Sequence, residues 1–344
     1  PSSGGSKAAY PCKSYGQGRI NPAYFYGVFD PNDMRRDVSI TMTGSNGKGV
    51  EKLIPFVPNS KAEGGGLTLN KWDENRQANP WVAAQRKSGI NGPYMRMSEV
   101  YLGYAEVCAA LGDVVTGKQY LKTVRERSFP QGLANTDAFI ASFGNDLVRA
   151  IIEERGFEYA GEGDRRWTLI RSGYLPEDIK RIKDMTKAMM DGLATKGYYE
   201  FENGNIISAY IWTKLVDAKT IYGHRLTAQC PTDKVNDPVL YPGWRGQKDN
   251  WEEMGLNYGS STPATNLAIK GLFEIVSEEE AASLESQGYT KVNWGIDLVD
   301  NRDEYDKYLF WDYDYVSAPI YLWPFTPNVM AAGGFTNGYG FKQE

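Results

Sequence analysis

The sequence has very few of the side chains on which most enzyme chemistry depends. Its 344 residues include a single histidine, His224, and three cysteines, Cys12, Cys108 and Cys230. One histidine removes most metal centres and most catalytic triads from consideration. An odd number of widely spaced cysteines with no CxxC pair also disfavours a disulfide framework and a zinc site. The sequence therefore predicts no bound metal and no cofactor.

Positive charge and long apolar runs are scarce as well. The net charge of −5 disfavours nucleic-acid binding, which usually shows a concentrated basic face. No segment approaches the roughly 18 consecutive apolar residues of a transmembrane helix. The N-terminal stretch PSSGGSKAAYPCKSYG lacks the features of a signal peptide and reads like a loop from the middle of a chain. We therefore expect the chain to be the C-terminal part of a longer precursor.

Aromatic residues are abundant instead, at 13% of the sequence. Many of them stand in polar segments rich in glycine and proline, such as NPAYFYGVFDPND and NKWDENRQANPW. Tyrosine and tryptophan in such segments either fill gaps beneath irregular connections or present flat faces to a ligand. Packing is the more common role for any one of them, because large aromatic side chains are mostly buried. Together they are consistent with a sugar-binding or peptide-binding surface.

The chain divides into three zones. Residues 1–92 are rich in loops, residues 93–194 are strongly helical, and residues 195–344 return to short segments with an acidic helix near 277–287. Within the helical zone, Pro93 stands at a helix-opening position, Gly112 ends the helix, and Asp113 caps a second one. Residues 94–127 are thus predicted to form one helical hairpin of tetratricopeptide-like length. Its first helix is predicted to bury Met97, Tyr101, Tyr104, Cys108 and Leu111.

The stretch RAIIEERGFEYAGEGDRRWTLIR combines carboxylates and arginines at high density. Thr136 and Asn145 are predicted to cap two helices, and the second one places Leu147, Ile151, Glu154 and Glu158 along one seam. Carboxylates on a core-facing seam destabilise a fold unless they are paired. The nearest cations are Arg155 and, beyond a turn at Gly161–Gly163, Arg165 and Arg166.

Two interpretations of these charges compete. Paired carboxylates about 5–9 Å apart are the machinery of glycoside hydrolysis, but one of them must stay protonated. Every candidate acid here has an arginine within a few residues, which lowers its pKa. We therefore interpret Glu154, Arg155, Glu158, Arg165 and Arg166 as a structural brace with no catalytic residue. Mutation of Glu154 or Arg166 is expected to lower stability and to leave ligand affinity intact.

Several ordered motifs resemble those of the SusD/RagB family. The segments YMRMSEVYLGYAEVCAALGD, YLKTVRERSF and LVRAIIEERGFEYAGEGDRRWTLIRSG follow its three helical motifs in order, and FDPNDMRRDVSIT and YLWPFTPNVM resemble two flanking elements. The matching residues are Arg96, Glu99, Leu102, Ala105, Glu106, Val124, Arg125, Arg127, Glu154, Arg155, Glu158, Glu162, Gly163, Arg166 and Arg171. The sequence departs from the family at Thr168, where aspartate is usual, and in the closing AAGGFTNGYGF.

The resemblance implies a mainly α-helical, SusD-like fold in which tetratricopeptide-like hairpins support long ordered loops and a few short β-strands. It implies one domain, 1–344, incomplete at its N-terminus. This domain comprises a helical core at 93–194, a variable loop-rich insertion at 195–310 and a closing segment at 311–344. The family's lipoprotein signal has no counterpart here, and Cys12 does not lie in a lipobox. Contact with the membrane is therefore expected only through an N-terminal lipid anchor outside this sequence.

The resemblance also implies a function without catalysis. Such a protein captures oligosaccharides or polysaccharides at the surface of the Gram-negative outer membrane. It then delivers them to a SusC-like, TonB-dependent β-barrel transporter. Sugar rings stack on aromatic side chains while polar neighbours bind the hydroxyl groups. The residues predicted to contact a glycan are Trp72, Asp73, Asn75, Trp81, Tyr24 and Tyr26, with Trp244 and Trp251 as weaker candidates. Two alternatives remain open, a glycoside hydrolase and a lid for peptide or other non-glycan cargo on the same type of transporter.

Overall fold

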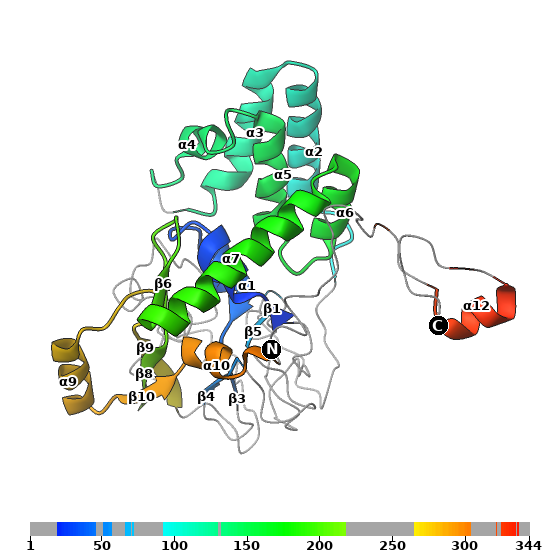
Figure 1. The fold of residues 1–344 in the computed structure, drawn as a ribbon. Coiled ribbons are helices and arrows are strands. Elements are labelled where there is room, and N and C mark those ends of the chain that lie inside the picture. The colour runs from blue at the N-terminus through cyan, green and yellow to red at the C-terminus, as the bar shows by residue number, and fades with distance from the viewer. Residues whose placement is uncertain are drawn as a thin grey trace, which may run out of the picture.

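The computed structural model describes residues 19–45, 51–56, 66–69, 71, 92–129, 132–217, 265–303, 321, 325–334 and 336. Figure 1 shows that helices dominate this part of the chain and that the strands are short. The expected mainly α fold with a few short strands is therefore confirmed. The helical layer consists of α2 (Met97–Ala110), α3 (Val114–Glu126), α4 (Thr136–Ala141), α5 (Leu147–Glu158), α6 (Asp164–Ser172) and α7 (Leu175–Lys196).

Helices α2 and α3 form the predicted hairpin. Gly112 follows α2 with a φ of +88°, a conformation that glycine adopts without strain. The carboxylate of Asp113 then accepts a hydrogen bond from the amide of Thr116 at 3.1 Å and so caps α3 as predicted. The start of α2 was predicted wrongly. The helix begins at Met97 and not near Pro93, because Arg96 keeps an extended backbone (φ −141°, ψ 162°).

The buried face of α2 also differs from the prediction. The helix buries Ser98, Leu102, Ala105 and Cys108. Tyr104 and Leu111, which were expected in the core, are 49% and 81% exposed. Both sets of residues recur at helical spacing, so periodicity alone does not choose between them. The smaller residues face inward because α2 packs closely against α3 and α5, where little room remains for long side chains.

The caps of α4 and α5 each lie one residue from the predicted position. Asn135 caps α4 by accepting a hydrogen bond from the amide of Ala138 at 3.0 Å. Asp146 caps α5 in the same way, with the amide of Arg149 at 3.0 Å. Asn145 instead takes a positive φ of 65° in the turn that precedes α5. Asparagine tolerates this conformation better than most residues, which explains its place there.

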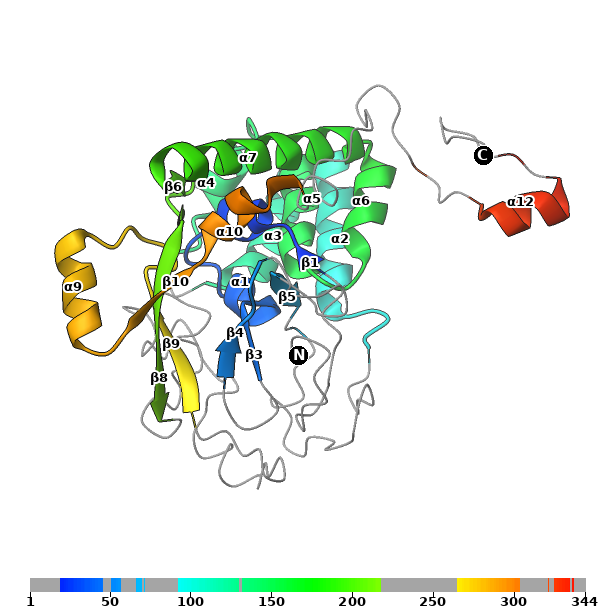
Figure 2. The same cartoon turned by 60° about the horizontal axis from the view of Figure 1, so that its bottom comes forward.

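The strands of the described residues form four small antiparallel sheets. One sheet of the N-terminal region has the order β1 (Arg19–Ile20), β5 (Leu67–Leu69) and β2 (Ile40–Thr41). A second sheet there pairs β3 (Thr43–Ser45) with β4 (Glu51–Leu53). A third sheet follows α7 directly and pairs β6 (Tyr198–Glu200) with β7 (Ile206–Ser208). The largest sheet has the order β10 (Thr290–Asn293), β8 (Tyr210–Asp217) and β9 (Thr265–Lys270). Figure 2 shows this sheet along one side of the molecule, with α7 crossing the top.

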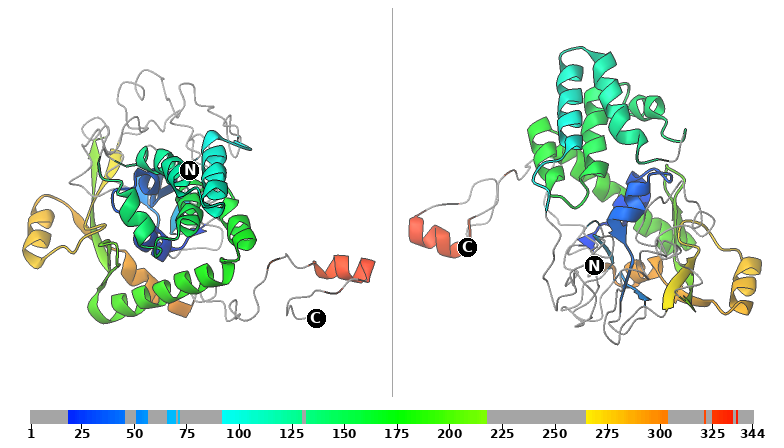
Figure 3. Two further views of the ribbon diagram at one scale, coloured as in Figure 1. Left: turned by 90° about the horizontal axis from the view of Figure 1, so that it is seen from above. Right: turned by 180° about the vertical axis from the view of Figure 1, so that it is seen from behind.

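Five further helical elements complete the described part of the chain. The π-helical turn η1 (Tyr24–Val28) and helix α1 (Met34–Ser39) precede β2, and α10 (Gly295–Asp300) follows β10. Helix α9 (Glu278–Ser286) matches the acidic helix expected near 277–287. Figure 3 shows α1 beneath the helical layer, and α12 (Pro327–Gly333) away from the other elements. No residue of α12 is buried.

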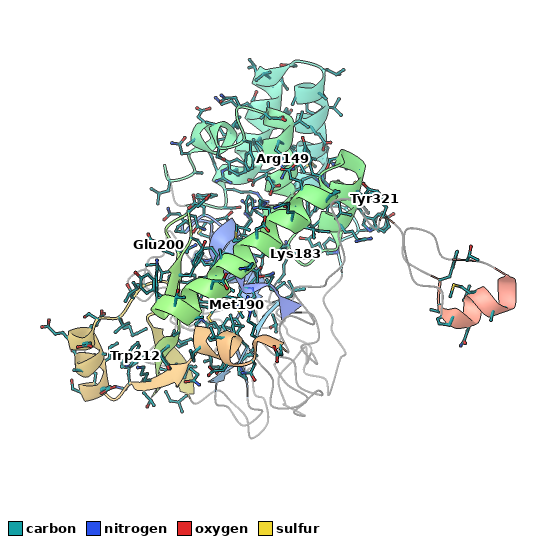
Figure 4. All side chains as sticks on the ribbon, viewed as in Figure 1. Arg149, Lys183, Met190, Glu200, Trp212 and Tyr321 are labelled. Atoms are coloured by element: carbon teal, nitrogen blue, oxygen red, sulfur yellow. The ribbon has the colours of Figure 1, made fainter. Side chains whose placement is uncertain are left out.

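Two main hydrophobic cores stabilise the described part of the chain, together with a small third cluster between α5, α6 and α7. The smaller one joins α2, α3, α4 and α5 through residues such as Leu102, Leu121 and Ile151. The larger one lies between α7 and the sheets and contains Met190 and Trp294, both fully buried. Figure 4 labels Met190, the member of this second core that lies on α7. Helix α5 lies where the two cores meet, since Phe157 belongs to the larger core and Ile151 to the smaller one.

Candidate functional site

Helix α5 carries three glutamates into the interior. Glu153, Glu154 and Glu158 are 2%, 0% and 3% exposed. A buried carboxylate destabilises the fold by several kcal/mol unless cations and hydrogen bonds compensate for its lost hydration. The surroundings of these three residues therefore decide whether the motif is a brace or a reactive site.

Glu154 is held by two arginines from distant parts of the chain. Its carboxylate accepts hydrogen bonds from Arg35 Nη1 at 2.6 Å and from Arg125 Nη1 at 2.9 Å. Arg35 lies in α1, and Asp33, which caps that helix, also binds its guanidinium at 2.7 Å. Arg125 lies in the last turn of α3. Glu154 thus connects α5 to α1 and to α3.

Glu158 gathers three arginines one turn further along α5. Arg35 Nη1 lies 3.1 Å from its carboxylate, and both Arg96 and Arg127 form ion pairs with the same group. Burial opposes ionisation of this carboxyl, yet the positive charges of Arg35, Arg127 and Arg96 outweigh burial and lower its pKa to about 2. Glu158 is therefore a fixed anion at neutral pH.

Glu153 faces the opposite side of α5, toward α6 and α7. Its carboxylate pairs with Arg149 at 3.0 Å and with Arg165 at 2.9 Å. Arg165 also binds Asp178 of α7 at 2.9 Å. Space for Arg165 comes from Gly156, because a Cβ at that position would lie 2.9 Å from Arg165 Nη1. Figure 4 labels Arg149 on this side of the helical layer.

The carboxyl end of α5 also binds Lys71, and Arg96 makes further contacts there. Lys71 Nζ donates to the main-chain oxygen of Glu158 at 2.6 Å and pairs with Glu162. Arg96 donates from Nε and Nη2 to Glu162 at 3.0 and 2.9 Å, and from Nη2 to the same Glu158 oxygen at 2.6 Å. We call Lys71, Arg96, Glu158 and Glu162 the anchor cluster. A helix C-terminus attracts cations, so the main chain contributes to this site as well.

Several of the ion pairs on α5 differ from those that the sequence predicted. Arg165 does return to α5 after the glycine turn, where it binds Glu153 and not Glu154 or Glu158. Arg155 pairs with Glu99 and Asp164, each at 2.7 Å. Arg166 Nη2 donates to the main-chain oxygen of Tyr321 at 3.4 Å.

The partners of Glu154 and Glu158 were missed because proximity in the sequence was used to choose them. Arg35, Arg96, Arg125 and Arg127 are all remote from α5 in the sequence. A signal for them was present, since each of these arginines belongs to one of the family-like motifs quoted above. Arginines and carboxylates in separate motifs of a single fold are natural partners for each other.

Most of the predicted glycan contacts lie outside the described residues. These are Trp72, Asp73, Asn75, Trp81, Trp244 and Trp251. Lys71 and Gly92 are the described residues that flank the segment 72–91, which holds the first four.

Tyr26 lies in the core, and Tyr24 is partly buried and packs against that core. Tyr26 is 0% exposed, stacks on Phe201 and accepts a hydrogen bond from Trp294 Nε1 at 2.8 Å. The Tyr24 hydroxyl donates to the main-chain oxygen of Gly156 at 2.9 Å. The π-helical turn η1 directs these rings inward. Packing is therefore the role that the structure gives Tyr26, and a glycan contact by its ring does not fit this burial.

The arrangement on α5 is suited to holding segments together and not to proton transfer. Each of its three glutamates accepts hydrogen bonds from arginine, and a general acid must instead remain protonated near neutral pH. Among the residues that the structure describes, no group of three or more His, Cys, Asp or Glu side chains could hold a metal ion. Within those same ranges, no helix combines the length and the apolar character needed to cross a membrane.

The fold and the anchor cluster define a mainly helical scaffold protein whose motif arginines and glutamates join its helices to N-terminal segments. The chain belongs to the SusD family, whose pattern matches residues 5–324. It is 28% identical over 160 residues to the SusD-like protein P25 of Formosa agariphila, which corresponds to 46% of this chain and 26% of that protein.

Comparison with solved structures finds a SusD superfamily protein from Bacteroides vulgatus. It shares 18% identity and a TM-score of 0.32, over 54% of this chain and 41% of the other. In both comparisons the match spans less than half the length of the relative.

Proposed function

We propose that the protein captures oligosaccharides at the cell surface and delivers them to a SusC-like, TonB-dependent transporter of the outer membrane, without catalysis. The observation that carries this proposal is membership of the SusD family over residues 5–324. A scaffold of ion-paired helices that supports aromatic-rich segments agrees with such a role. The same proposal places the protein on the outer membrane of a Gram-negative bacterium through an N-terminal lipid anchor.

Ligand contact is assigned to Trp72, Asp73, Asn75 and Trp81, with Trp244 and Trp251 as secondary contacts. An indole ring stacks on the C–H face of a pyranose, while carboxylate and amide groups bind its hydroxyls. These residue types stand together in NKWDENRQANPW. Tyr26 is left out because it is fully buried, and Tyr24 because its hydroxyl is bonded to the main chain of α5.

The test begins with a panel of plant, host and microbial oligosaccharides and isothermal titration calorimetry on every hit. Trp72→Ala and Trp81→Ala should each weaken binding by about fivefold or more, if a stacked sugar ring loses on the order of 1–3 kcal/mol on removal of the aromatic ring, as a stacked nucleobase does. Trp167→Ala is the matched control, because Trp167 lies on α6 and is 57% exposed. Unchanged affinity in both variants would overturn the assignment of the site.

Two outcomes would redirect the function itself. Release of reducing ends from a panel glycan would identify a glycoside hydrolase. A panel without hits, together with co-purification of the SusC-like transporter, would identify a lid for peptide or other non-glycan cargo. The ionised state of Glu158 argues against the first outcome, because a carboxyl with a pKa of about 2 does not donate a proton at neutral pH.

A further inference from the structure

The largest sheet turns one of its faces away from the larger core. Ile211 and Ile269 belong to that core and Val292 packs against it, which identifies the inner face of β8, β9 and β10. Because side chains alternate along a strand, Tyr210 and Trp212 lie on the outer face of β8. Figure 4 labels Trp212 on this strand. The outer face thus carries two aromatic residues on its central strand.

Two lysines stand on either side of Trp212 on this face. The strand register pairs Trp212 with Lys291 of β10 and with Lys270 of β9. Neighbouring strands are about 4.8 Å apart, so the two lysine Cα atoms are about 10 Å apart across the indole. Lys291 Nζ lies 4.2 Å from the ring centroid of Tyr210 and 5.7 Å from that of Trp212. The aromatic rings therefore hold one ammonium group over the face.

Neither of these lysines is neutralised by a carboxylate in the described part of the chain. The ammonium of Lys291 contacts the two rings, and Lys270 forms no ion pair with any described residue. Within the same ranges, the glutamates of the neighbouring helix α9 form no salt bridge with either lysine. Lys214, the third lysine of this face, instead donates to the main-chain oxygen of Gln287 at 2.6 Å. Two positive charges are therefore available to a ligand.

Trp212 adds a hydrogen-bond donor that lacks an acceptor. The residue is 6% exposed, and its Nε1 is buried with no hydrogen-bond partner among the described residues. Buried N–H groups in folded proteins are nearly always bonded, so an unpaired one calls for an acceptor from outside the chain. An anion that binds the ammonium of Lys291 approaches the same indole, because that ammonium lies over it. Lysines on edge strands also prevent pairing with other strands, but that role needs no buried indole donor.

We infer that Trp212, Lys270 and Lys291 form a binding site for an acidic sugar unit, one that carries a carboxylate or a sulfate group. Lys270 and Lys291 pair with the anionic oxygens, Trp212 Nε1 donates to one of them, and Tyr210 positions Lys291. This inference rests on the proposed function and deepens it by naming anionic oligosaccharides as the ligand class. The net charge of −5 does not oppose it, because charges further than about 8 Å away are largely screened at physiological ionic strength.

Calorimetry on matched pairs of oligosaccharides tests the ligand class. Oligogalacturonates are compared with their methyl esters, and sulfated carrageenan oligosaccharides with their desulfated forms. In at least one pair the acidic member should bind at least about tenfold more tightly, and raising NaCl from about 50 to about 500 mM should remove most of that advantage. The pair that responds distinguishes a carboxylate from a sulfate. Equal affinities within both pairs would overturn the inference and leave the proposed function intact.

Charge-removing variants test the residues themselves. Lys270→Met and Lys291→Met should each weaken binding of the acidic oligosaccharide by about tenfold, as expected for a lost charge-assisted hydrogen bond, and leave its neutral partner unaffected. Lys122→Met is the matched control, because Lys122 is an exposed lysine of α3 that pairs with Glu126 instead. Its affinity should equal that of the wild type. Unchanged affinity in both test variants, or an equal loss in the control, would overturn the inference.

A titration with inorganic sulfate, followed by nuclear magnetic resonance, tests the same site without any glycan. The indole N–H resonance of Trp212, assigned by its loss in Trp212→Phe, should shift in the wild type. It should stay in place in a variant that carries both Lys270→Met and Lys291→Met. A panel without any glycan hit would overturn the proposed function, whereas this titration would still decide whether the site binds an anion. An unshifted resonance in the wild type would overturn the anion site.

Discussion

The two sides of helix α5 are both closed by ion pairs, but the partners differ in where they come from. Glu153 is paired with Arg149, Arg165 and, at 3.5 Å, Arg181, all from α5, α6 and α7. Glu154 and Glu158 are paired with arginines of α1, of the start of α2 and of the end of α3. The first set stabilises a bundle of consecutive helices. The second set joins α1, the start of α2 and the end of α3 to α5.

The largest expected effect comes from breaking the long-range side at its most buried point. Glu154→Ala should lower the free energy of unfolding by about 3–5 kcal/mol, because it leaves the charges of Arg35 and Arg125 without their shared partner. Urea denaturation measures this loss. Affinity for a panel glycan should remain that of the wild type in the folded protein, since Glu154 is fully buried. A loss below about 1 kcal/mol would contradict the buried pairing.

The second effect uses pH to weaken the same side. The pKa of Glu158 is lowered to about 2 in the folded protein, from its ordinary value of 4.5, by Arg35, Arg127 and Arg96, so its ionisation stabilises the fold fully above about pH 4.5. That contribution is lost as pH falls from 4.5 through 2, and its size is on the order of 3 kcal/mol. As the pH is lowered from 7 to 2.5, the free energy of unfolding should therefore fall more steeply for the wild type than for Glu158→Gln. Parallel curves would show that Glu158 does not titrate as described.

The comparison also explains what the sequence could predict. The hairpin, the cap at Asp113, the glycine turn after α5 and the burial of Glu154 and Glu158 follow from local patterns of capping, φ preference and periodicity. The partners of those glutamates cannot be predicted from local patterns, because a carboxylate is paired with whichever cation the tertiary fold brings near. The buried face of α2 was missed for a related reason: two stripes had helical spacing, and only packing against α3 and α5 selects one.

The candidate site was predictable in part. Burial of Glu158 was expected, whereas its position between Lys71 and Arg96 depends on how β5 and α2 approach α5. Aromatic composition led to the same prediction for Tyr26 and Trp72, so it did not reveal that Tyr26 is buried. Both stand in polar, irregular sequence, and the inward direction of Tyr26 results from the π-helical turn that carries it.

A smaller effect is expected on the opposite side of α5. Arg165→Met should lower the free energy of unfolding by about 2 kcal/mol, less than for Glu154→Ala, because Glu153 keeps Arg149 and the Arg165 side chain is 23% exposed. Hydrogen exchange should rise in α6 and α7 and stay unchanged around Lys71 and Arg96. A rise at the anchor cluster as well would mean that the two sides of α5 act as one network.

The smallest effect should come from a pair outside both sets. Arg171 and Glu106 join α6 to α2, with 47% and 19% of their side chains exposed. Because water screens such a pair, Arg171→Met should change the free energy of unfolding by less than about 1 kcal/mol, and raising the salt concentration should reduce the difference further. Urea denaturation at low and high salt measures both quantities. A loss as large as that of Glu154→Ala would show that burial does not separate the strong pairs of this scaffold from the weak ones.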